Sequence, residues 1–252
     1  MTTDRSGPCA DNSEGEPCAN RYNRRMMELD GIFLDFYGTV AAGDRAAVVA
    51  ICERVVADHG LALNPEELAV AWGHHYFEAI ETCVGERFRL LVEIERATLI
   101  ETLGKHACRI DPDPYISMFN DYLTRPSLYD EVREVLGALD RPVCIVSNAD
   151  ERELLLAVEH LGLTFDYMIT SENARSYKPD AVIFEAALRL TGWRAERVVH
   201  VGDSLHSDVG GAQRLGLRTA WVNRAVRMTD IGREKPDWTW TDLRPLLALA
   251  RV

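Results

Sequence analysis

Five short apolar segments, most of them separated by stretches with helical periodicity, constrain the fold of this chain most. Continuous apolar runs of this length are typical of strands buried on both faces of a sheet. They are Gly31–Asp35, Pro142–Ser147, Tyr167–Thr170, Arg197–Gly202 and Leu217–Val222, and the pattern is weakest in Tyr167–Thr170. Helical segments separate the last four, and alternating strand and helix favour parallel pairing. The sequence therefore predicts an α/β fold around a parallel sheet.

Local signals place two of the intervening helices. Asp150 and Glu153 have the spacing of a capping box, with Asp150 as N-cap and the Glu153 side chain reaching back, and Gly162 closes that helix. Pro179 can start the next helix, because a proline in the first turn loses no hydrogen bond.

The interval 44–125 has a different pattern, since it contains no convincing strand. Helical periodicity recurs in AAVVAICERVVADHG, PEELAVAWGHHYFEAIE and ERFRLLVEIERATLIETLG. We expect a helical domain at 44–125, inserted into a core formed by 29–43 and 126–252. Residues 1–28 contain too little apolar surface to offset the entropy of ordering, so we expect a disordered tail.

Composition excludes several classes of partner. The net charge of −12 argues against a broad basic surface for nucleic acid. No apolar run is long enough for a membrane span, and the N-terminus lacks the apolar stretch of a secretory signal. The six scattered cysteines form no C-x-x-C pair, which favours reduced thiols. We expect a cytoplasmic protein, monomeric or homodimeric, that acts on a small molecule.

Polar side chains follow three of the predicted strands at the point where each strand ends. Asp35 ends the first, Ser147 and Asn148 end the second, and Gly202 and Asp203 end the fourth. In an open α/β sheet, ligands bind beyond these carboxyl ends. Lys178 and Asp208 lie in the connecting segments nearby in the chain. Each residue alone has an ordinary structural explanation, but together the carboxylates, hydroxyl and ammonium suit a phosphoryl group and a hard divalent cation.

In this order, the motifs resemble those of the haloacid dehalogenase-like hydrolase superfamily. Asp35–Thr39 is similar to its first motif, Ser147 to its second, Lys178 to its third, and Gly202 through Asp208 to its fourth. The match spans residues 31–222. The resemblance implies a Rossmann-like parallel sheet core with an inserted all-helical cap domain, and 44–125 is the interval where the family places that cap.

The resemblance also implies roles for individual residues. Asp35 would be a nucleophile that forms a covalent aspartyl intermediate, Thr39 and Ser147 would hydrogen-bond the reacting groups, and Lys178 would neutralise their charge. In the phosphatase branch, Mg²⁺ would be held by Asp35, the carbonyl of Tyr37 and Asp203, with Asp208 behind them. The candidate substrate contacts are Tyr37, Gly38, Asn148 and His74.

Tyr37 departs from the pattern of most phosphatases of this family, which have an aspartate there as general acid for the leaving alcohol. L-2-haloacid dehalogenases have a tyrosine at this position, because a halide leaves without a proton. The rest of the chain departs from the dehalogenases. They need no metal, their fourth motif carries serine and asparagine where this chain has Gly202 and Asp203, and they have a tyrosine where Phe184 stands. Their cap also carries an arginine that neither Arg45 nor Arg54 matches.

The prediction is therefore a Mg²⁺-dependent phosphomonoester hydrolase that acts on a small phosphorylated metabolite through an aspartyl-phosphate. The alternatives are a metal-independent L-2-haloacid dehalogenase or a non-catalytic phosphate-binding member of the superfamily. With the acid absent, His74 could supply the missing proton because imidazole titrates near neutrality, and His206 is a second candidate. The remaining candidates for substrate selection are expected to pack or to face solvent instead; they are Trp72, His75, Tyr76, Arg87 and Arg89.

Overall fold

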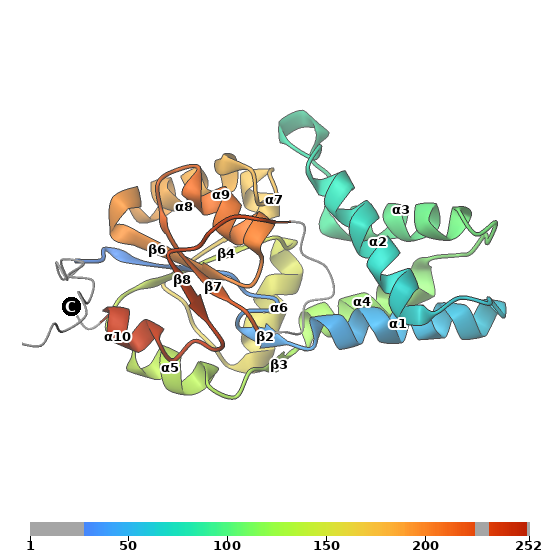
Figure 1. The fold of residues 1–252 in the computed structure, drawn as a ribbon, viewed down its shortest axis with the longest axis horizontal. Helices are drawn as coiled ribbons and strands as arrows, with labels where there is room; N and C mark the ends of the chain where they lie inside the picture. The colour runs from blue at the N-terminus through green and yellow to red at the C-terminus, as the bar shows by residue number, and fades with distance from the viewer. Residues whose placement is uncertain (1–27, 225–231, 251–252) are drawn as a thin grey trace, which may run out of the picture.

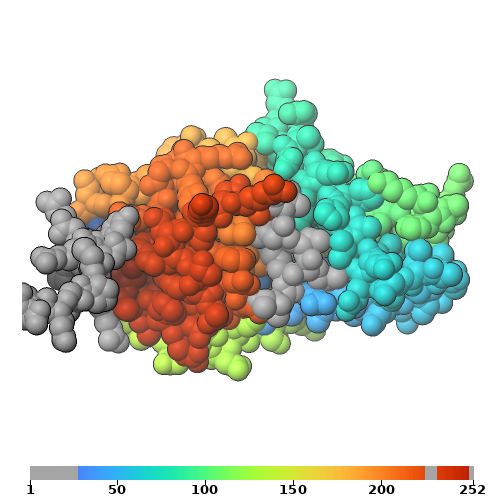
Figure 2. Space-filling model, viewed as in Figure 1, coloured from blue at the N-terminus to red at the C-terminus, as the bar shows by residue number. Residues whose placement is uncertain are grey.

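The computed structural model describes residues 28–224 and 232–250. Nearly all of the predicted tail, residues 1–27, lies outside the described residues. The described chain forms a sheet-based core and, beside it, a helical segment that we call the helical insert (residues 44–125), as Figure 1 shows. Figure 2 shows the helical insert protruding from one side of the core.

The core is built on a six-stranded parallel sheet in the order β5-β4-β1-β6-β7-β8. The strands are β1 (Gly31–Leu34), β4 (Val143–Ser147), β5 (Tyr167–Thr170), β6 (Val198–Gly202), β7 (Arg218–Val222) and β8 (Trp238–Trp240). All five predicted strands are present, which confirms the parallel α/β prediction. Strand β8 escaped prediction because it is only three residues long and ends next to a polar loop.

Helices cover both faces of this sheet (Figure 1). Successive β1 residues point to opposite sides: Ile32 and Leu34 pack with one helical layer, and Phe33 packs with the other. The first layer contains α5 (Val132–Ala138), α6 (Glu151–Leu161) and α10 (Leu246–Ala250), and the second contains α8 (Ala181–Thr191) and α9 (Gly211–Gln213). Because both faces are covered, every β1 residue is buried, which explains the uninterrupted apolar runs.

The shorter elements lie at the edges of the core. They are the helix α7 (Ser171–Ala174), the single turns η2 (Ala195–Arg197) and η3 (Leu205–Gly210), and the strands β2 (Ala41–Ala42) and β3 (Ser127–Leu128). The last two pair with each other antiparallel, immediately before and after the helical insert. This two-stranded ladder brings the two connections between core and insert together.

The helical insert contains α1 (Asp44–His59), α2 (Pro65–Ile80), α3 (Leu91–Gly104), α4 (Asp113–Thr124) and the single turn η1 (Gly85–Arg87). It has its own apolar core, to which all four α-helices contribute, for example through Ile51, Trp72, Leu99 and Phe119. Asn64 caps α2 by accepting hydrogen bonds from the backbone of Glu66 and Glu67. No strand occurs between residues 44 and 125, in keeping with the periodicity of that interval.

The predicted capping box at Asp150 is wrong, although Asp150 is the N-cap residue of α6 and Gly162 closes that helix. The Asp150 carboxylate makes no bond to its own helix. Instead it accepts from the backbone N–H of Leu91 at 2.7 Å and of Val92 at 3.1 Å, in the first turn of α3. The N-terminus of a helix attracts negative charge and has unpaired N–H groups, so a core carboxylate can satisfy it. Asp150 thus ties the helical insert to the core.

Pro179 also lies outside the position predicted for it. Helix α8 begins at Ala181 with Asp180 as its N-cap, whose side chain accepts from the N–H of Val182. Pro179 precedes this cap, and the Lys178–Pro179 peptide bond is cis.

Two of the compositional predictions can be compared with the described residues. Within them, no helix has the length and apolarity required to traverse a bilayer. The cysteines described, Cys52, Cys83, Cys108 and Cys144, have free thiols, and Cys9 and Cys18 lie outside the described residues.

Replacing Asp150 tests the contact between core and insert. We expect Asp150→Ala to lower the free energy of unfolding by about 1–3 kcal/mol, because two N–H groups near the buried start of α3 lose their acceptor. Asp150→Asn should cost less, since its amide oxygen still accepts one bond. Urea denaturation measures both, with the exposed Asp140→Ala as control. If Asp150→Ala and Asp140→Ala are equally stable, the contact contributes nothing.

Candidate active site

The polar residues that follow the predicted strands meet at one edge of the sheet. Strands β4, β1 and β6 are neighbours, so their carboxyl ends bring Ser147, Asp35 and Asp203 together. A cavity of about 170 Å³ lies between this edge and the helical insert, and all three residues line it. Its other side is an apolar wall from the insert, formed by Val48, Trp72, Tyr76, Phe77, Leu91, Phe119 and Leu123.

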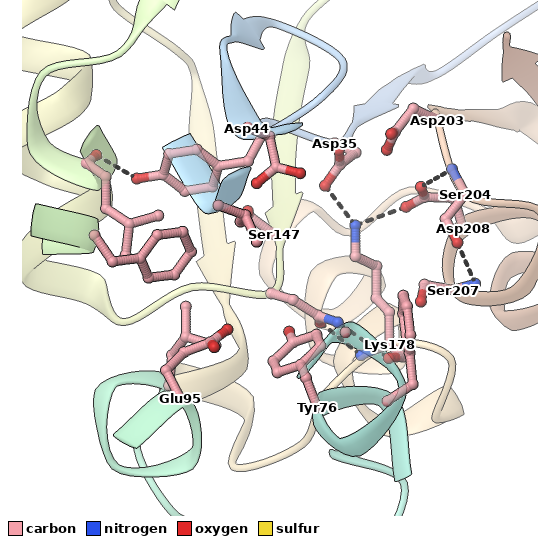
Figure 3. A pocket seen from close by; sticks show the side chains of 18 of the residues that line it. Asp35, Asp44, Tyr76, Glu95, Ser147, Lys178, Asp203, Ser204, Ser207 and Asp208 are labelled. Atoms are coloured by element: carbon pink, nitrogen blue, oxygen red, sulfur yellow. Dashed lines mark hydrogen bonds and ion pairs between the residues drawn. The ribbon is translucent and has the colours of Figure 1, made fainter. Parts of the chain in front are cut away.

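Lys178 is the centre of the site. Its Nζ donates to Asp35 Oδ1 and to Asp208 Oδ1, both at 2.6 Å, and all three residues are buried (Figure 3). The two carboxylates hold the pKa of the Lys178 ammonium above its usual value, although burial opposes this. Lys178 therefore stays charged, and it is positioned where negative charge would develop on a group attacked by Asp35.

Asn148 fixes the backbone of Lys178. The Asn148 Nδ2 donates to the Lys178 carbonyl at 3.1 Å, and the Lys178 N–H donates to Asn148 Oδ1 at 2.7 Å. These paired bonds span from the end of β4 to the segment before α8. Asn148, predicted as a substrate contact, lines the cavity, but its amide is occupied in holding Lys178.

Asp208 lies beneath Lys178, in the turn η3. Besides the lysine, it pairs with His200 Nε2 at 2.9 Å and accepts from the Ser204 N–H at 2.9 Å. Lys178 and His200 hold the pKa of Asp208 far below its usual range despite burial. Because Asp208 already has three partners, it is better suited to orienting Lys178 than to ligating an ion. Its predicted role at the metal is therefore limited to supporting the residues that would hold the ion. His200 was missed in the sequence, where the signal was a lone histidine inside an apolar strand.

Asp35 has one oxygen bound and one without a partner among the described residues. Lys178 holds Oδ1, whereas the buried Oδ2 accepts no hydrogen bond. Burial is the main cause that raises the pKa of Asp35 to about 7, the charges of Asp208 and Asp203 add to it, and Lys178 opposes it. Oδ2 is therefore the atom available to attack a substrate or to bind a cation.

A third carboxylate, Asp203, completes a candidate cation site. Oxygen atoms of Asp35, Asp203 and Asp208 lie within 4.8 Å of one another. The loop after β1 permits this approach: Gly38 has φ of +89°, and a Cβ there would lie 2.6 Å from Asp203 Oδ2. Gly38 does not line the cavity, unlike the substrate contact predicted for it. In this structure it instead allows Asp203 to pack closely against the loop.

Tyr37 lines the cavity, but its hydroxyl is committed elsewhere. It donates to the carbonyl of Leu123 in α4 at 2.7 Å. The ring packs against both the core and the apolar centre of the insert, with an edge-on contact to Phe36. Burial raises the pKa of the Tyr37 phenol far above its usual value. Tyr37 thus joins the insert to the loop after β1, and its proton is unavailable at neutral pH.

Thr39 is fully buried behind the site. Its Oγ1 has no hydrogen-bond partner among the described residues, and its carbonyl accepts from Arg224 at 2.9 Å. Thr39 does not line the cavity. Its predicted bond to the nucleophile is therefore absent from this arrangement.

Neither histidine proposed as a proton donor reaches the cavity. His74 lies on the exposed side of α2, which contradicts its predicted substrate contact, because the helical repeat turns Trp72, Gly73, Tyr76 and Phe77 inward instead. His206 Nε2 pairs with Glu81 at 3.1 Å, at the border between core and insert.

The other insert candidates divide into two groups. Trp72 and Tyr76 pack in the insert and also line the cavity. His75 is buried against Thr102 and Lys105, whereas Arg87 and Arg89 are exposed and outside the cavity lining.

The cavity is strongly acidic. Asp44 and Glu95 of the insert line it together with Asp35, Asp203 and Asp208, whereas Lys178 is the one lysine or arginine in the described lining. Arg45 and Arg54 do not reach it, because they face solvent and pair with Glu66 and Asp58. Glu95 and Asp44 were not singled out from the sequence, since an acidic residue on a helix is ordinarily solvated.

Comparison with known proteins finds relatives of this chain. The (S)-2-haloacid dehalogenase of Pseudomonas sp. (strain YL) is 27% identical over 234 residues, which are 89% of this chain and 95% of that protein. The ribulose-1,5-bisphosphate 5-phosphatase of Halopiger xanaduensis is 36% identical over 103 residues, 39% of this chain and 43% of that protein. The structure of the L-2-haloacid dehalogenase from Xanthobacter autotrophicus superposes with a TM-score of 0.73 at 23% identity, covering 88% of this chain and 98% of that one.

Residues 29–216 match the family model described as haloacid dehalogenase-like hydrolase, which includes every motif around the cavity. This match confirms the resemblance inferred from Asp35, Ser147, Lys178 and Asp203. The chain belongs to the haloacid dehalogenase-like hydrolase family.

Proposed function

We propose that this hydrolase is a Mg²⁺-dependent phosphomonoester hydrolase that forms an aspartyl-phosphate on Asp35. The main observation is the carboxylate cluster of the site. Asp35, Asp203 and Asp208 lie close together, and the Lys178 ammonium pairs with Asp35 and Asp208. A cluster of three buried or half-buried carboxylates whose oxygens lie within 4.8 Å of one another offers the ligand type that a divalent cation prefers.

The donor set fits Mg²⁺. This ion prefers carboxylate and carbonyl oxygens and retains several waters. Asp35 Oδ2, buried and without a hydrogen-bond partner among the described residues, and the Asp203 carboxylate would hold it, together with the Tyr37 carbonyl. When bound, the ion would neutralise the charge of the phosphoryl oxygens and so make phosphorus easier to attack. Replacing an aspartate side chain by Tyr37 does not remove that backbone carbonyl.

The residues of the chain then divide the work. Asp35 attacks phosphorus and the bond to the leaving oxygen breaks, so that the phosphoryl group is transferred to the carboxylate. Lys178, held by Asp208 and Asn148, stabilises the charge on the phosphoryl oxygens. The Ser147 hydroxyl lines the cavity at the end of β4, where it can donate to the transferred group. Water hydrolyses the intermediate and restores Asp35.

A metal-independent 2-haloacid dehalogenase is the second candidate. Tyr37 and the names of the relatives favour it. The electrostatics of the cavity disfavour a dehalogenase. A 2-haloacid carries a carboxylate, and the described lining offers no cation besides Lys178 to bind it. Lys178 is already shared by Asp35 and Asp208. The third candidate, a non-catalytic phosphate-binding protein, is less consistent with the site. Burying the Asp35–Lys178 pair costs free energy, and a protein without catalysis would have no need of that pair.

The first test concerns the nucleophile. Asp35→Asn retains the shape of the side chain but removes the attacking charge, so we expect phosphate ester hydrolysis to fall by several orders of magnitude. Steady-state kinetics on a panel of phosphorylated metabolites measure this, with Asp140→Asn as a solvent-exposed control. Retention of more than a few per cent of the wild-type rate would exclude Asp35 as the nucleophile.

The second test concerns the metal. We expect a chelator to abolish hydrolysis and added Mg²⁺ to restore it, with modest affinity, because the protein provides only two carboxylates and one carbonyl. Asp203→Ala should remain inactive at Mg²⁺ concentrations that saturate the wild type, while its thermal melting shows that it is folded. The same samples are assayed with 2-chloropropionate. Full activity in excess chelator, or turnover of 2-chloropropionate and of no phosphate ester, would establish the dehalogenase instead.

A further inference from the structure

The proposed function leaves one chemical requirement unmet, and this inference rests on that function. When a phosphate ester of an alcohol is cleaved, the leaving oxygen needs a proton, and a positioned acid typically accelerates this step by about 10²–10⁴-fold. The Tyr37 hydroxyl is bonded to Leu123, and Lys178 is shared by two carboxylates. Neither His74 nor His206 lines the cavity. The donor must therefore be sought on the insert side.

Glu95 lies on that side. It belongs to α3, lines the cavity and is only 8% exposed. Figure 3 shows its carboxyl group across the cavity from Asp35, pointing into the space between them. Within the described residues, this carboxyl group has no hydrogen bond or ion pair. The hydrogen bond from the Thr98 hydroxyl goes to the backbone carbonyl of Glu95 and not to its side chain. A buried carboxyl group without a counter-ion is a costly feature unless it is neutral.

The surroundings of Glu95 favour its protonated form. Asp44 of α1 and Tyr76 of α2 line the same cavity, and Asp150 and Glu153 line a smaller cavity that Glu95 and Tyr37 also border. Lys178 faces the shared cavity, but its ammonium is committed to Asp35 and Asp208. Burial first, and then the charges of Asp44 and Asp150, raise the pKa of Glu95 to about 8. At neutral pH, Glu95 is thus a carboxylic acid.

We propose that Glu95 is the general acid of this enzyme, supplied by the helical insert in place of a residue on the loop after β1. As the Asp35 carboxylate forms its bond to phosphorus, the bond from phosphorus to the ester oxygen breaks. The ester oxygen keeps that electron pair and takes the proton of Glu95, so an alcohol leaves rather than an alkoxide. Glu95 becomes a carboxylate.

The same residue can complete the cycle. A water oxygen attacks phosphorus, the bond between phosphorus and Asp35 breaks, and the electron pair returns to the Asp35 carboxylate. The Glu95 carboxylate takes the proton that this water releases. Phosphate leaves, and both carboxyl groups are in their starting states. Only a group whose pKa lies near the working pH can serve in both directions.

Glu95→Gln tests the proposal with two substrates in saturating Mg²⁺. For an alkyl phosphate, such as glycerol phosphate, we expect kcat to fall by about 10²–10⁴-fold. For p-nitrophenyl phosphate, whose leaving group is a stable anion and needs no proton, kcat should change by less than about tenfold. Glu101→Gln, on an exposed turn of the same helix, is the matched control. In the wild type, alkyl phosphate turnover should decrease as the pH rises above about 8, and the variant should lack this decrease.

A second measurement does not depend on turnover. The infrared difference spectrum between the wild type and Glu95→Gln should contain the carbonyl band of a protonated carboxylic acid, which disappears as the pH rises through about 8. Equal losses on both phosphates, or no loss on either, would overturn the role of Glu95 while leaving the proposed function intact. Absence of the protonated band at neutral pH would overturn it as well. A wild type that hydrolyses neither phosphate would instead overturn the proposed function.

Discussion

The Lys178 ammonium between two carboxylates is the interaction on which the site depends. Asp35 follows strand β1 and Asp208 lies in the turn η3, and both carboxylates are buried against the lysine. Hydrogen bonds position both sides of this interaction. Asn148 bonds the backbone of Lys178, and His200 pairs with Asp208. A buried ion pair of this kind adds little net stability, so its value lies in placing a permanent positive charge beside Asp35.

The helical insert supplies the rest of the cavity, and specific polar contacts hold it against the core. Asp150 caps α3, Tyr37 donates to Leu123 in α4, and Tyr177 donates to the carbonyl of Arg89. These contacts set the distance between Asp35 and the apolar wall of Trp72, Tyr76 and Phe119. The small cavity that results, about 170 Å³, restricts the substrate to a small molecule unless the insert moves.

The opposing indications for phosphatase and dehalogenase come from different parts of the chain. Tyr37 is a dehalogenase-like feature by resemblance, and several relatives bear that name. In this structure, however, the tyrosine has a structural role. Its hydroxyl donates a hydrogen bond to Leu123 of the insert, and its ring packs against the apolar residues of both the core and the insert. The carboxylate cluster of Asp35, Asp203 and Asp208 is the feature that favours the phosphatase proposal, because carboxylate oxygens are preferred ligands of Mg²⁺.

The sequence by itself determined the parallel α/β core, the position of the helical insert and the residues at the strand ends. These follow from local periodicity, and the carboxyl ends of parallel strands must lie on one edge of a sheet. Only the tertiary structure decided which other residues reach that edge. One residue of difference along α2 turns His74 to solvent and Gly73 to the cavity, and the position of α3 beside the cavity leaves Glu95 buried. Asp150 likewise caps a helix distant in the sequence rather than its own. Local patterns record neighbours along the chain, whereas burial, charge and long-range hydrogen bonds arise only when separate elements pack together.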